Sequence, residues 1–318
     1  MTGRTVKGRA TRSRAGRGRL PRAGLSVALA AVLLVLFAAF GMILLRHESG
    51  PGAVRKRPSP SASTPLAVTV PPPPVSPKMG PRPRIAIVID DLGIDRQATE
   101  RAIRLPAAVT LAFLPYAHDV AGQAKRAATH GHELLVHLPM EPVGSADPGP
   151  MALYRDLNDA EFRQRLAWNL SRFSGFVGIN NHMGSAYTAD VPAMRRLMRA
   201  LASRKLMFLD SRTTKLTRAE MTAAGVGVRF ARRSVFLDHE RGAAAVRAAL
   251  HRLERRARRN GAAIAIGHPH RHTLAALEAW LPDLERRGFV LVPVSSLAQR
   301  PAAIAKRSRG WKLAPARP

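Results

Sequence analysis

The hydrophobic positions of this chain form one long run near the N-terminus and many short runs after it. Residues 23–45 carry no charge and are rich in Leu, Ala, Val and Phe. A helix of this length, rising about 1.5 Å per residue, crosses a hydrocarbon core about 30 Å thick, so the run predicts one transmembrane helix. Residues 1–22 contain eight Lys or Arg and no acid, which by the positive-inside rule predicts a cytoplasmic N-terminus and an exported remainder. A cleaved signal peptide is the alternative, although the run exceeds the usual apolar region of about 7–15 residues.

Short apolar runs of strand length recur between residues 84 and 298, with helical patterns between most of them. The strand candidates are residues 85–89, 109–114, 133–138, 176–179, 206–209, 226–230, 262–266 and 289–294. Asp95 and Asp190 stand where they can cap a following helix, and Asn158 begins a capping-box pattern. Residues 246–259 and 274–287 have amphipathic spacing. Strands that alternate with helices predict an α/β domain with a parallel sheet, either open or closed into a barrel.

The segments on either side of this domain have the composition of unpacked chain. Residues 46–83 are rich in Pro, Ser and Gly, which predicts an extended linker with polyproline character. Residues 299–318 are basic and rich in Pro and Ala, and we expect a disordered tail. The predicted order is a basic cytoplasmic segment (1–22), a transmembrane helix (23–45), a Pro-rich linker (46–83), a folded domain (84–298) and a basic tail (299–318).

Composition and charge restrict the binding partners and the kinds of metal site that we expect for this chain. The formal net charge is +30, of which +11 falls in residues 84–297, and a charge of this size raises nucleic acid as a partner. Because the folded domain is predicted to lie outside the cytoplasm, we expect no nucleic-acid partner, and the basic flanks suit anionic lipid or cell-wall polymer instead. The chain has no cysteine, so any metal must be held by His, Asp and Glu.

The strand candidate at residues 85–89 leads directly into two adjacent carboxylates, Asp90 and Asp91, and a turn at Gly93. Neighbouring strand residues point to different sides of the backbone, which can set a metal ligand beside a general base. This pattern makes the chain a candidate hydrolase. The alternative is that both aspartates only cap the helix that follows, since Asp at such a turn accepts hydrogen bonds from free N–H groups.

Polar residues also follow several other strand candidates, and in α/β folds the working residues lie at the carboxyl ends of the strands. They are His137, Glu141, Asn180, Asn181, His182, Asp210 and His268. Pro139 excludes a regular helix, so we expect His137 and Glu141 on a loop that, with a carboxylate from another strand, could hold Zn²⁺ or a similar divalent ion. Each residue also has a structural alternative, such as a buried histidine or a polar turn. Six further histidines are expected to face solvent: His118, His130, His132, His239, His270 and His272.

In this combination the sequence resembles the polysaccharide deacetylase superfamily, and most closely its divergent branch of exported bacterial proteins, over residues 84–297. The first motif of the family has paired aspartates, and residues 88–93 match it, which implies that Asp90 is the general base and Asp91 a metal ligand. The second motif matches at residues 131–133 and at His137, but Glu141 stands where the family has a second histidine. We expect His182 to supply the missing ligand, with Glu141 as the alternative ligand or as the partner that orients His137.

Two further motifs of the family bear on the site. Its third motif, an Arg-Pro-Tyr segment, is absent, and residues 178–185 stand in its place, with Asn180 and Asn181 as the expected substrate-binding residues. Residues 266–270 resemble the last motif, which implies that His268 is the general acid. Asp210 matches the acid that orients this histidine in the family.

The resemblance implies a distorted (β/α) barrel and a hydrolase that uses a divalent metal, with zinc as the expected ion, to deacetylate N-acetylated sugars of peptidoglycan or another envelope polysaccharide. Together with the predicted N-terminal helix, it places the catalytic domain in the periplasm, held at the inner membrane by one spanning segment. Glu141 and the absent third motif keep a second hypothesis open, a membrane-anchored glycan-binding or scaffold protein without turnover. A third is hydrolysis of another bond, such as an O-acetyl ester or a phosphoester.

Overall fold

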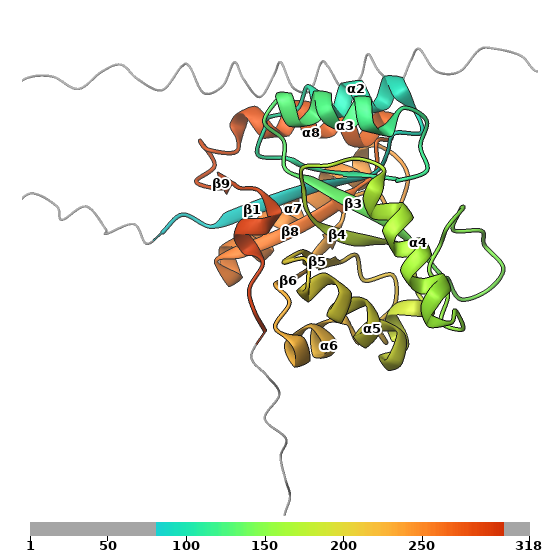
Figure 1. The fold of residues 1–318 in the computed structure, drawn as a ribbon. Helices are drawn as coiled ribbons and strands as arrows, with labels where there is room; N and C mark the ends of the chain where they lie inside the picture. Colours follow the sequence, from blue (N-terminus) through green and yellow to red (C-terminus); the bar gives the residue numbers. More distant parts are fainter. Residues whose placement is uncertain (1–80, 302–318) are drawn as a thin grey trace, which may run out of the picture. The chain divides into compact units, whose positions relative to one another are not determined.

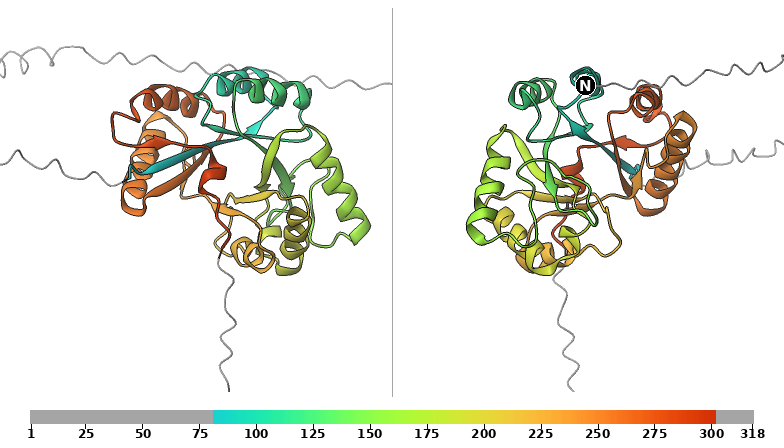
Figure 2. Two further views of the ribbon diagram at one scale, coloured as in Figure 1. Left: turned by 60° about the vertical axis from the view of Figure 1, so that its left-hand side comes forward. Right: turned by 90° about the vertical axis from the view of Figure 1, so that its right-hand side faces the viewer.

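Parallel strands run through the centre of the domain, and helices pack around them (Figures 1 and 2). The computed structural model describes residues 81–301. Within these residues no helix combines the length and the apolar character that crossing a bilayer requires. The predicted transmembrane helix, nearly all of the predicted linker and most of the predicted tail lie outside the described residues.

The strands form one sheet in which every pairing is parallel. They are β1 (Arg84–Leu92), β2 (Thr110–Phe113), β3 (Leu134–Met140), β4 (Phe176–Met183), β5 (Met207–Asp210), β6 (Phe230–Arg232), β7 (Val235–Phe236), β8 (Ala262–Gly267) and β9 (Val290–Leu291). Their order is β6-β5-β4-β3-β2-β1-β8-β7, and β9 pairs with β1. The expected distorted barrel is confirmed: β6 and β7 stand at the two ends of this order although they are consecutive in the sequence. No pairing in the described residues joins them, so the barrel stays open along one seam.

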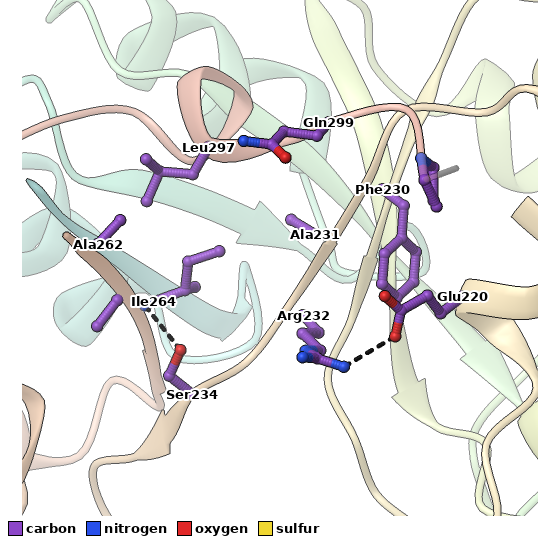
Figure 3. Close-up of a pocket in the computed structure, with 11 residues that line it drawn as sticks. Glu220, Phe230, Ala231, Arg232, Ser234, Ala262, Ile264, Leu297 and Gln299 are labelled. Atoms are coloured by element: carbon purple, nitrogen blue, oxygen red, sulfur yellow. Dashed lines mark hydrogen bonds and ion pairs between the residues drawn. The ribbon is translucent and has the colours of Figure 1, made fainter. Parts of the chain in front are cut away.

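A pocket of about 230 Å³ lies along this seam, between β6 and β8 (Figure 3). Ala231, Ile264 and Leu297 give it apolar walls. The Ser234 hydroxyl accepts the N–H of Ile264 at 3.2 Å and so satisfies one backbone group at the seam. None of the polar residues singled out from the sequence lines this pocket, so it is not the candidate site.

The helices pack around the outside of the strands and begin near the strands' carboxyl ends (Figure 2). They are α2 (Arg96–Ile103), α3 (Val120–Thr129), α4 (Asp159–Ser171), α5 (Val191–Ala202), α6 (Ala219–Val226), α7 (Ala243–Asn260) and α8 (Arg271–Trp280). The three predicted caps are confirmed. Asp95 and Asp190 each accept a backbone N–H in the first turn of α2 and α5, and Asn158 forms a complete capping box with Glu161 at the start of α4.

Three predicted elements are wrong in part, each because of a nearby glycine or proline. The candidate strand at 226–230 is mostly a turn, because α6 ends at Val226, Gly227 takes φ +76°, and β6 begins only at Phe230. The candidate strand at 289–294 shrinks to β9 because Pro293 cannot donate a backbone hydrogen bond and leads into a short 3₁₀ helix. The predicted helix at 274–287 ends early, with α8, because a proline follows it.

Pro139 lies within β3, so the prediction that His137 lies on a loop is wrong. β2 pairs with β3 only as far as Val136, and beyond it Leu153 bonds the carbonyl of Pro139 and the N–H of Glu141 on that edge, so no strand there requires an N–H from position 139. A proline lacks the N–H that a central strand would donate, and an edge position tolerates this. β3 therefore continues to Met140 while it stays paired with β4 on its other side.

Alternate side chains along the strands face the inside of the barrel, and their chemistry changes along each strand. The apolar inner cluster includes Ala86, Val88, Leu135, Met207, Leu209, Ile264 and Ile266. Because side chains alternate with a period of two, the same inward series continues to Asp90, His137 and His268. The other series packs beneath the helices in the larger core cluster. The interior thus changes from packed core to polar site at the carboxyl ends of the strands.

Candidate metal centre

The backbone turns at Asp91, and this turn brings two neighbouring carboxylates to one place. Asp91 has φ +57°, in the left-handed region, and the register between β1 and β2 shifts between Ile89 and Leu92. In a regular strand the two aspartates would face opposite sides. Here both reach Nε2 of His137, Asp90 Oδ2 at 3.7 Å and Asp91 Oδ1 at 3.1 Å. A left-handed residue other than glycine costs about 1–3 kcal/mol and is found mostly at functional sites.

The alternative that the paired aspartates only cap a helix is wrong. Asp95 is the residue that caps α2, through the N–H of Ala98. Asp90 instead accepts a hydrogen bond from Asn180, and Asp91 lies against His137 and His182. Both carboxylates are therefore directed into the polar end of the barrel.

Three donor atoms meet at this point, one each from β1, β3 and β4. Asp91 Oδ1, His137 Nε2 and His182 Nδ1 form a triangle with sides of 2.9, 3.1 and 3.2 Å. Around a tetrahedral zinc ion with bonds of about 2.0–2.1 Å, donor atoms stand about 3.3 Å apart, close to these values. Asp91 Oδ1 is also buried with no well-aligned hydrogen bond from the described part of the chain, and a bound cation would satisfy it. These residues fit a divalent ion with a fourth position left for water or substrate.

Asn180 connects the metal-binding group to Asp90. Its Nδ2 donates to Asp90 Oδ1 at 2.7 Å, and its Oδ1 accepts from Nδ1 of His137 at 2.9 Å. Because the amide nitrogen is used by Asp90, the amide oxygen must receive the proton on Nδ1, which leaves the Nε2 lone pair of His137 for a metal. The Asn180 side chain is fully buried.

The sequence-based expectation that Asn180 and Asn181 bind substrate does not match these contacts. Asn180 is occupied by Asp90 and His137. Asn181 accepts the N–H of Ser211 at 2.9 Å and donates to the carbonyl of Met183 at 2.8 Å, which ties the end of β4 to the loop after β5. Asn181 lines the cleft, but the structure gives both amides a positioning role.

Glu141 is not part of the metal-binding group. Its carboxylate accepts hydrogen bonds from the Arg155 guanidinium at 2.8 and 3.0 Å and from the Arg155 N–H at 2.8 Å. These bonds from Arg155 hold the pKa of Glu141 below its usual value. The orienting partner of His137 is Asn180, so Glu141 takes neither of the two roles expected for it, and His182 is the residue that joins Asp91 and His137.

The acid that holds His268 is Asp238, and sequence reasoning missed it. Asp238 Oδ1 lies 3.0 Å from His268 Nδ1, and Oδ2 accepts the backbone N–H of His268 at 2.7 Å and the Thr273 hydroxyl at 2.8 Å. Asp210 instead accepts the N–H of Arg212 and the hydroxyl of Thr217. A signal was present, because the apolar run at residues 235–237 ends in an acid just as β1 does.

The surroundings of Asp90 and Asp91, at the end of β1, shift the pKa values of their carboxyl groups in opposite directions. Burial raises the pKa of Asp90 above its usual value, and the charges of His137 and His268 only partly oppose this. Burial also acts to raise the pKa of Asp91, but the close contacts and charges of His137 and His182 outweigh it and hold that pKa well below its usual range. Asp90 is thus the better proton acceptor and Asp91 the carboxylate that stays ionised.

Two histidines beside these aspartates, His137 and His268, have pKa values shifted towards the protonated form. For His137 burial acts to lower the pKa, and the charges of Asp90 and Asp91 reverse the direction and raise it. For His268 burial again acts to lower the pKa, but the hydrogen bond and the charge of Asp238 raise it to about 9. His268 therefore carries a proton at neutral pH.

A cleft of about 380 Å³ lies at the carboxyl ends of the strands, a size within the range of small-molecule sites. Its lining includes Asp90, Asp91, His137, His182 and His268. A second group able to hold a metal, Asp238, His268 and His270, lies beside it, but two of its members already bond each other. His132, expected to face solvent, is buried at 6% exposure and places its ring nitrogens 2.8 Å from two backbone carbonyls. His132 therefore bonds backbone groups in the core and does not line the cleft.

Comparisons with known sequences point to one family. A family model described as divergent polysaccharide deacetylase matches residues 87–298. The uncharacterized protein YibQ of Escherichia coli (strain K12) is 37% identical over 218 residues, which cover 69% of this chain and 68% of that protein. An uncharacterized protein of Haemophilus influenzae is 36% identical over 201 residues, which cover 63% of this chain and 72% of that protein.

A solved structure shares the fold. An uncharacterized protein from Agrobacterium tumefaciens C58 superposes with a TM-score of 0.67 and 31% sequence identity, covering 70% of this chain and 92% of that one. The family match spans every residue of the candidate metal centre, from Asp90 to His268.

Proposed function

This chain belongs to the divergent polysaccharide deacetylase family, and from this premise we propose that it is a metal-dependent hydrolase of N-acetylated amino sugars in an envelope glycan such as peptidoglycan. The observation that supports the proposal most strongly is the convergence of Asp91, His137 and His182 beside the buried carboxylate of Asp90. An amide is a poor electrophile, so its hydrolysis needs a polarised carbonyl, an activated water and a proton for the departing amine.

Asp91, His137 and His182 would hold the ion, with zinc the expected one, and when bound it would polarise the amide carbonyl and lower the pKa of a water molecule. Asp90 takes the proton of the attacking water as that oxygen bonds to the carbonyl carbon. Its Oδ1 is fixed by Asn180 at 2.7 Å, and its Oδ2 lies on the side of the donor atoms, 3.7 Å from His137 Nε2. Its raised pKa makes it a stronger base than an ordinary aspartate.

His268 supplies the proton to the amine nitrogen as the carbon–nitrogen bond breaks. Its Nε2 lies 3.8 Å from Asp91 Oδ2, so the ring faces the same centre from the end of β8, the strand that pairs with β1 on the side away from β2. Asp238 fixes the ring through Nδ1 and keeps it protonated at neutral pH. The products are acetate and a free amino sugar.

The test is incubation of the purified full chain with an N-acetylated chito-oligosaccharide and with peptidoglycan. We expect acetate release, loss of acetyl from the sugar by mass spectrometry, and loss of both on chelation with recovery on adding Zn²⁺. Sugars that return unmodified from a chain carrying stoichiometric metal would overturn the proposal. Release of acetate from an O-acetyl ester alone, or of phosphate, would move the activity to another bond.

A glycan-binding protein without turnover is the rival from a different class. It is supported by Glu141 in place of the second histidine of the family and by the absence of the third motif. His182 lies where a third donor is needed, so this replacement no longer argues against catalysis.

We also propose that the domain works in the periplasm, held at the inner membrane through residues 23–45. The uncharged run and the eight preceding cations support this. Protease added to spheroplasts should digest the domain, and protection of the domain would contradict the placement.

A further inference from the structure

Two arginines stand in the wall of the cleft, Arg212 after β5 and Arg233 after β6. The Arg233 guanidinium lies over the ring of Phe236, 4.6 Å from its centroid. Its Nε donates to the carbonyl of Ser211 at 2.6 Å and its Nη2 to the carbonyl of Arg212 at 3.0 Å. Its Nη1 has no protein partner within residues 81–301. The side chain is thus held rigidly, with one edge of the guanidinium uncommitted.

The Arg212 side chain is exposed and makes no hydrogen bond or ion pair in the described domain. Neither Arg212 nor Arg233 has a carboxylate within 4.0 Å among those residues. The two loops therefore present two cations to the cleft, Arg233 held by hydrogen bonds and Arg212 exposed and unbonded, without a direct counter-charge.

The other carboxylates around the cleft are engaged by groups other than these arginines. Asp90 and Asp91 face His137 and His182, and Asp238 is hydrogen-bonded to His268. The oxygens of Asp210 are likewise taken, by the Arg212 N–H and the Thr217 hydroxyl. Arg212 is exposed to water, but Arg233 is half-buried with no carboxylate within 4.0 Å in the described residues. A guanidinium partly removed from water without a direct counter-charge is unfavourable, so the cleft suits a ligand that brings a negative charge.

We propose that Arg212 and Arg233 form a subsite for an oxyanion, a carboxylate or a phosphate, carried by the sugar whose acetyl group is removed. The inference rests on the proposed function, and it narrows the substrate to anionic derivatives of N-acetylated amino sugars. Guanidinium groups suit carboxylate and phosphate because their parallel N–H groups match paired oxygens. Arg233, held by its hydrogen bonds, is pre-organised for such a contact, and the unbonded guanidinium of Arg212 lines the same cleft.

A purely structural role explains only part of this arrangement. Arg233 does tie the loop after β6 to the loop after β5, which accounts for its Nε and Nη2. It does not account for the free Nη1 or for Arg212, whose side chain holds nothing in place. Arg212→Gln is therefore the informative variant, because it removes a charge from the cleft without removing a structural contact.

The experiment measures binding of three probes to the full chain by calorimetry: N-acetylglucosamine, its 6-phosphate, and N-acetylmuramic acid, which carries a carboxylate. At least one anionic probe should bind about tenfold more tightly than the neutral one, and which of them does so identifies the anion. Arg212→Gln should reduce this preference to about threefold or less without changing affinity for the neutral sugar. Lys215→Gln is the matched control, because it removes one charge from the same loop but lies outside the cleft lining, and it should keep the preference.

Equal binding of neutral and anionic probes, absence of any binding, or an equal effect of the two variants would overturn the subsite. Acetate release measured in the same samples separates this inference from the proposed function. Arginine-dependent preference without acetate release would retain the subsite and remove the deacetylase activity. Acetate release without a preference for anionic probes would retain the deacetylase activity and remove the subsite.

Discussion

The carboxylate of Asp91 lies 2.9 Å from Nδ1 of His182, a contact that joins the end of β1 to the end of β4 across the mouth of the barrel. It depends on the left-handed backbone of Asp91 and on the inward-facing series of β4, in which His182 follows Asn180. The sequence resemblance leaves the third metal ligand open between His182 and Glu141, and this geometry favours His182. The metal-binding group therefore depends on the left-handed turn at Asp91, where β1 ends.

The turn after Asp91 should be sensitive to a side chain at position 93. Gly93 has φ +104°, and a Cβ there would lie 2.5 Å from Cβ of Ala117. We expect Gly93→Ala to lower the free energy of unfolding by about 1–3 kcal/mol, because it adds a clash to backbone strain. Gly144→Ala is the control, since Gly144 also has positive φ but no atom within 4 Å of its added Cβ. Equal falls in melting temperature for both variants would show that the packing against Ala117 is unimportant.

Asn180 should matter for metal affinity more than its distance from the ion suggests. Asn180→Ala removes the acceptor that orients His137 and the donor to Asp90, so we expect metal affinity to fall about 10–100-fold, measured by competition with a chelator. Asn169→Ala removes another buried amide, one bonded to the carbonyls of Met151 and Arg165 far from the cleft lining. It should destabilise the fold and leave metal affinity unchanged. Similar losses of metal in both variants would reduce the role of Asn180 to general stability.

Asp90 should be needed for turnover and dispensable for folding and metal binding. Asp90→Asn keeps the shape and the acceptor for Asn180 but removes the base, so acetate release should fall about 10²–10⁴-fold. Because burial disfavours the ionised form of Asp90, the variant should melt no lower than the unmodified chain. Asp156→Asn changes an exposed aspartate and serves as control. Activity near that of the control would exclude Asp90 as the base.

The pH profile should distinguish Asp238 from Asp210. His268 acts in its protonated form, so activity should fall as the pH rises through its pKa of about 9. Asp238→Asn removes the charge that raises this pKa, and the alkaline limb should move to lower pH by roughly one unit. Asp210→Asn should leave the limb in place, because Asp210 bonds Arg212 and Thr217. A shift with Asp210→Asn and none with Asp238→Asn would restore the assignment made from the family resemblance.

Much of the site could be predicted from the sequence because parallel strands end together. Apolar runs that end in Asp90, His137, His182 and His268 indicate one edge of a sheet, and the structure brings all four together there. Side chains alternate between the two faces of a strand, so the apolar residues that face the barrel interior are followed, two positions later, by a polar residue on the same face. This alternation also helped the prediction.

The parts that were missed depend on pairings between strands and on loops. The role of Asn180 follows from its register opposite His137 in the β3–β4 pair, which no single segment shows. Asp238 follows β7, a strand of two residues defined only by its pairing with β8, too short for a periodic signal. Glu141 was misplaced because its partner, Arg155, lies on a loop whose path the sequence pattern does not fix.

The decisive experiment is metal quantification of the purified full chain, with anomalous diffraction at the absorption edge of the ion. We expect one divalent ion bound by Asp91 Oδ1, His137 Nε2 and His182 Nδ1, lost in His182→Ala and retained in Glu141→Ala. A chain that binds no divalent ion, or an ion held instead by Asp238, His268 and His270, would contradict it.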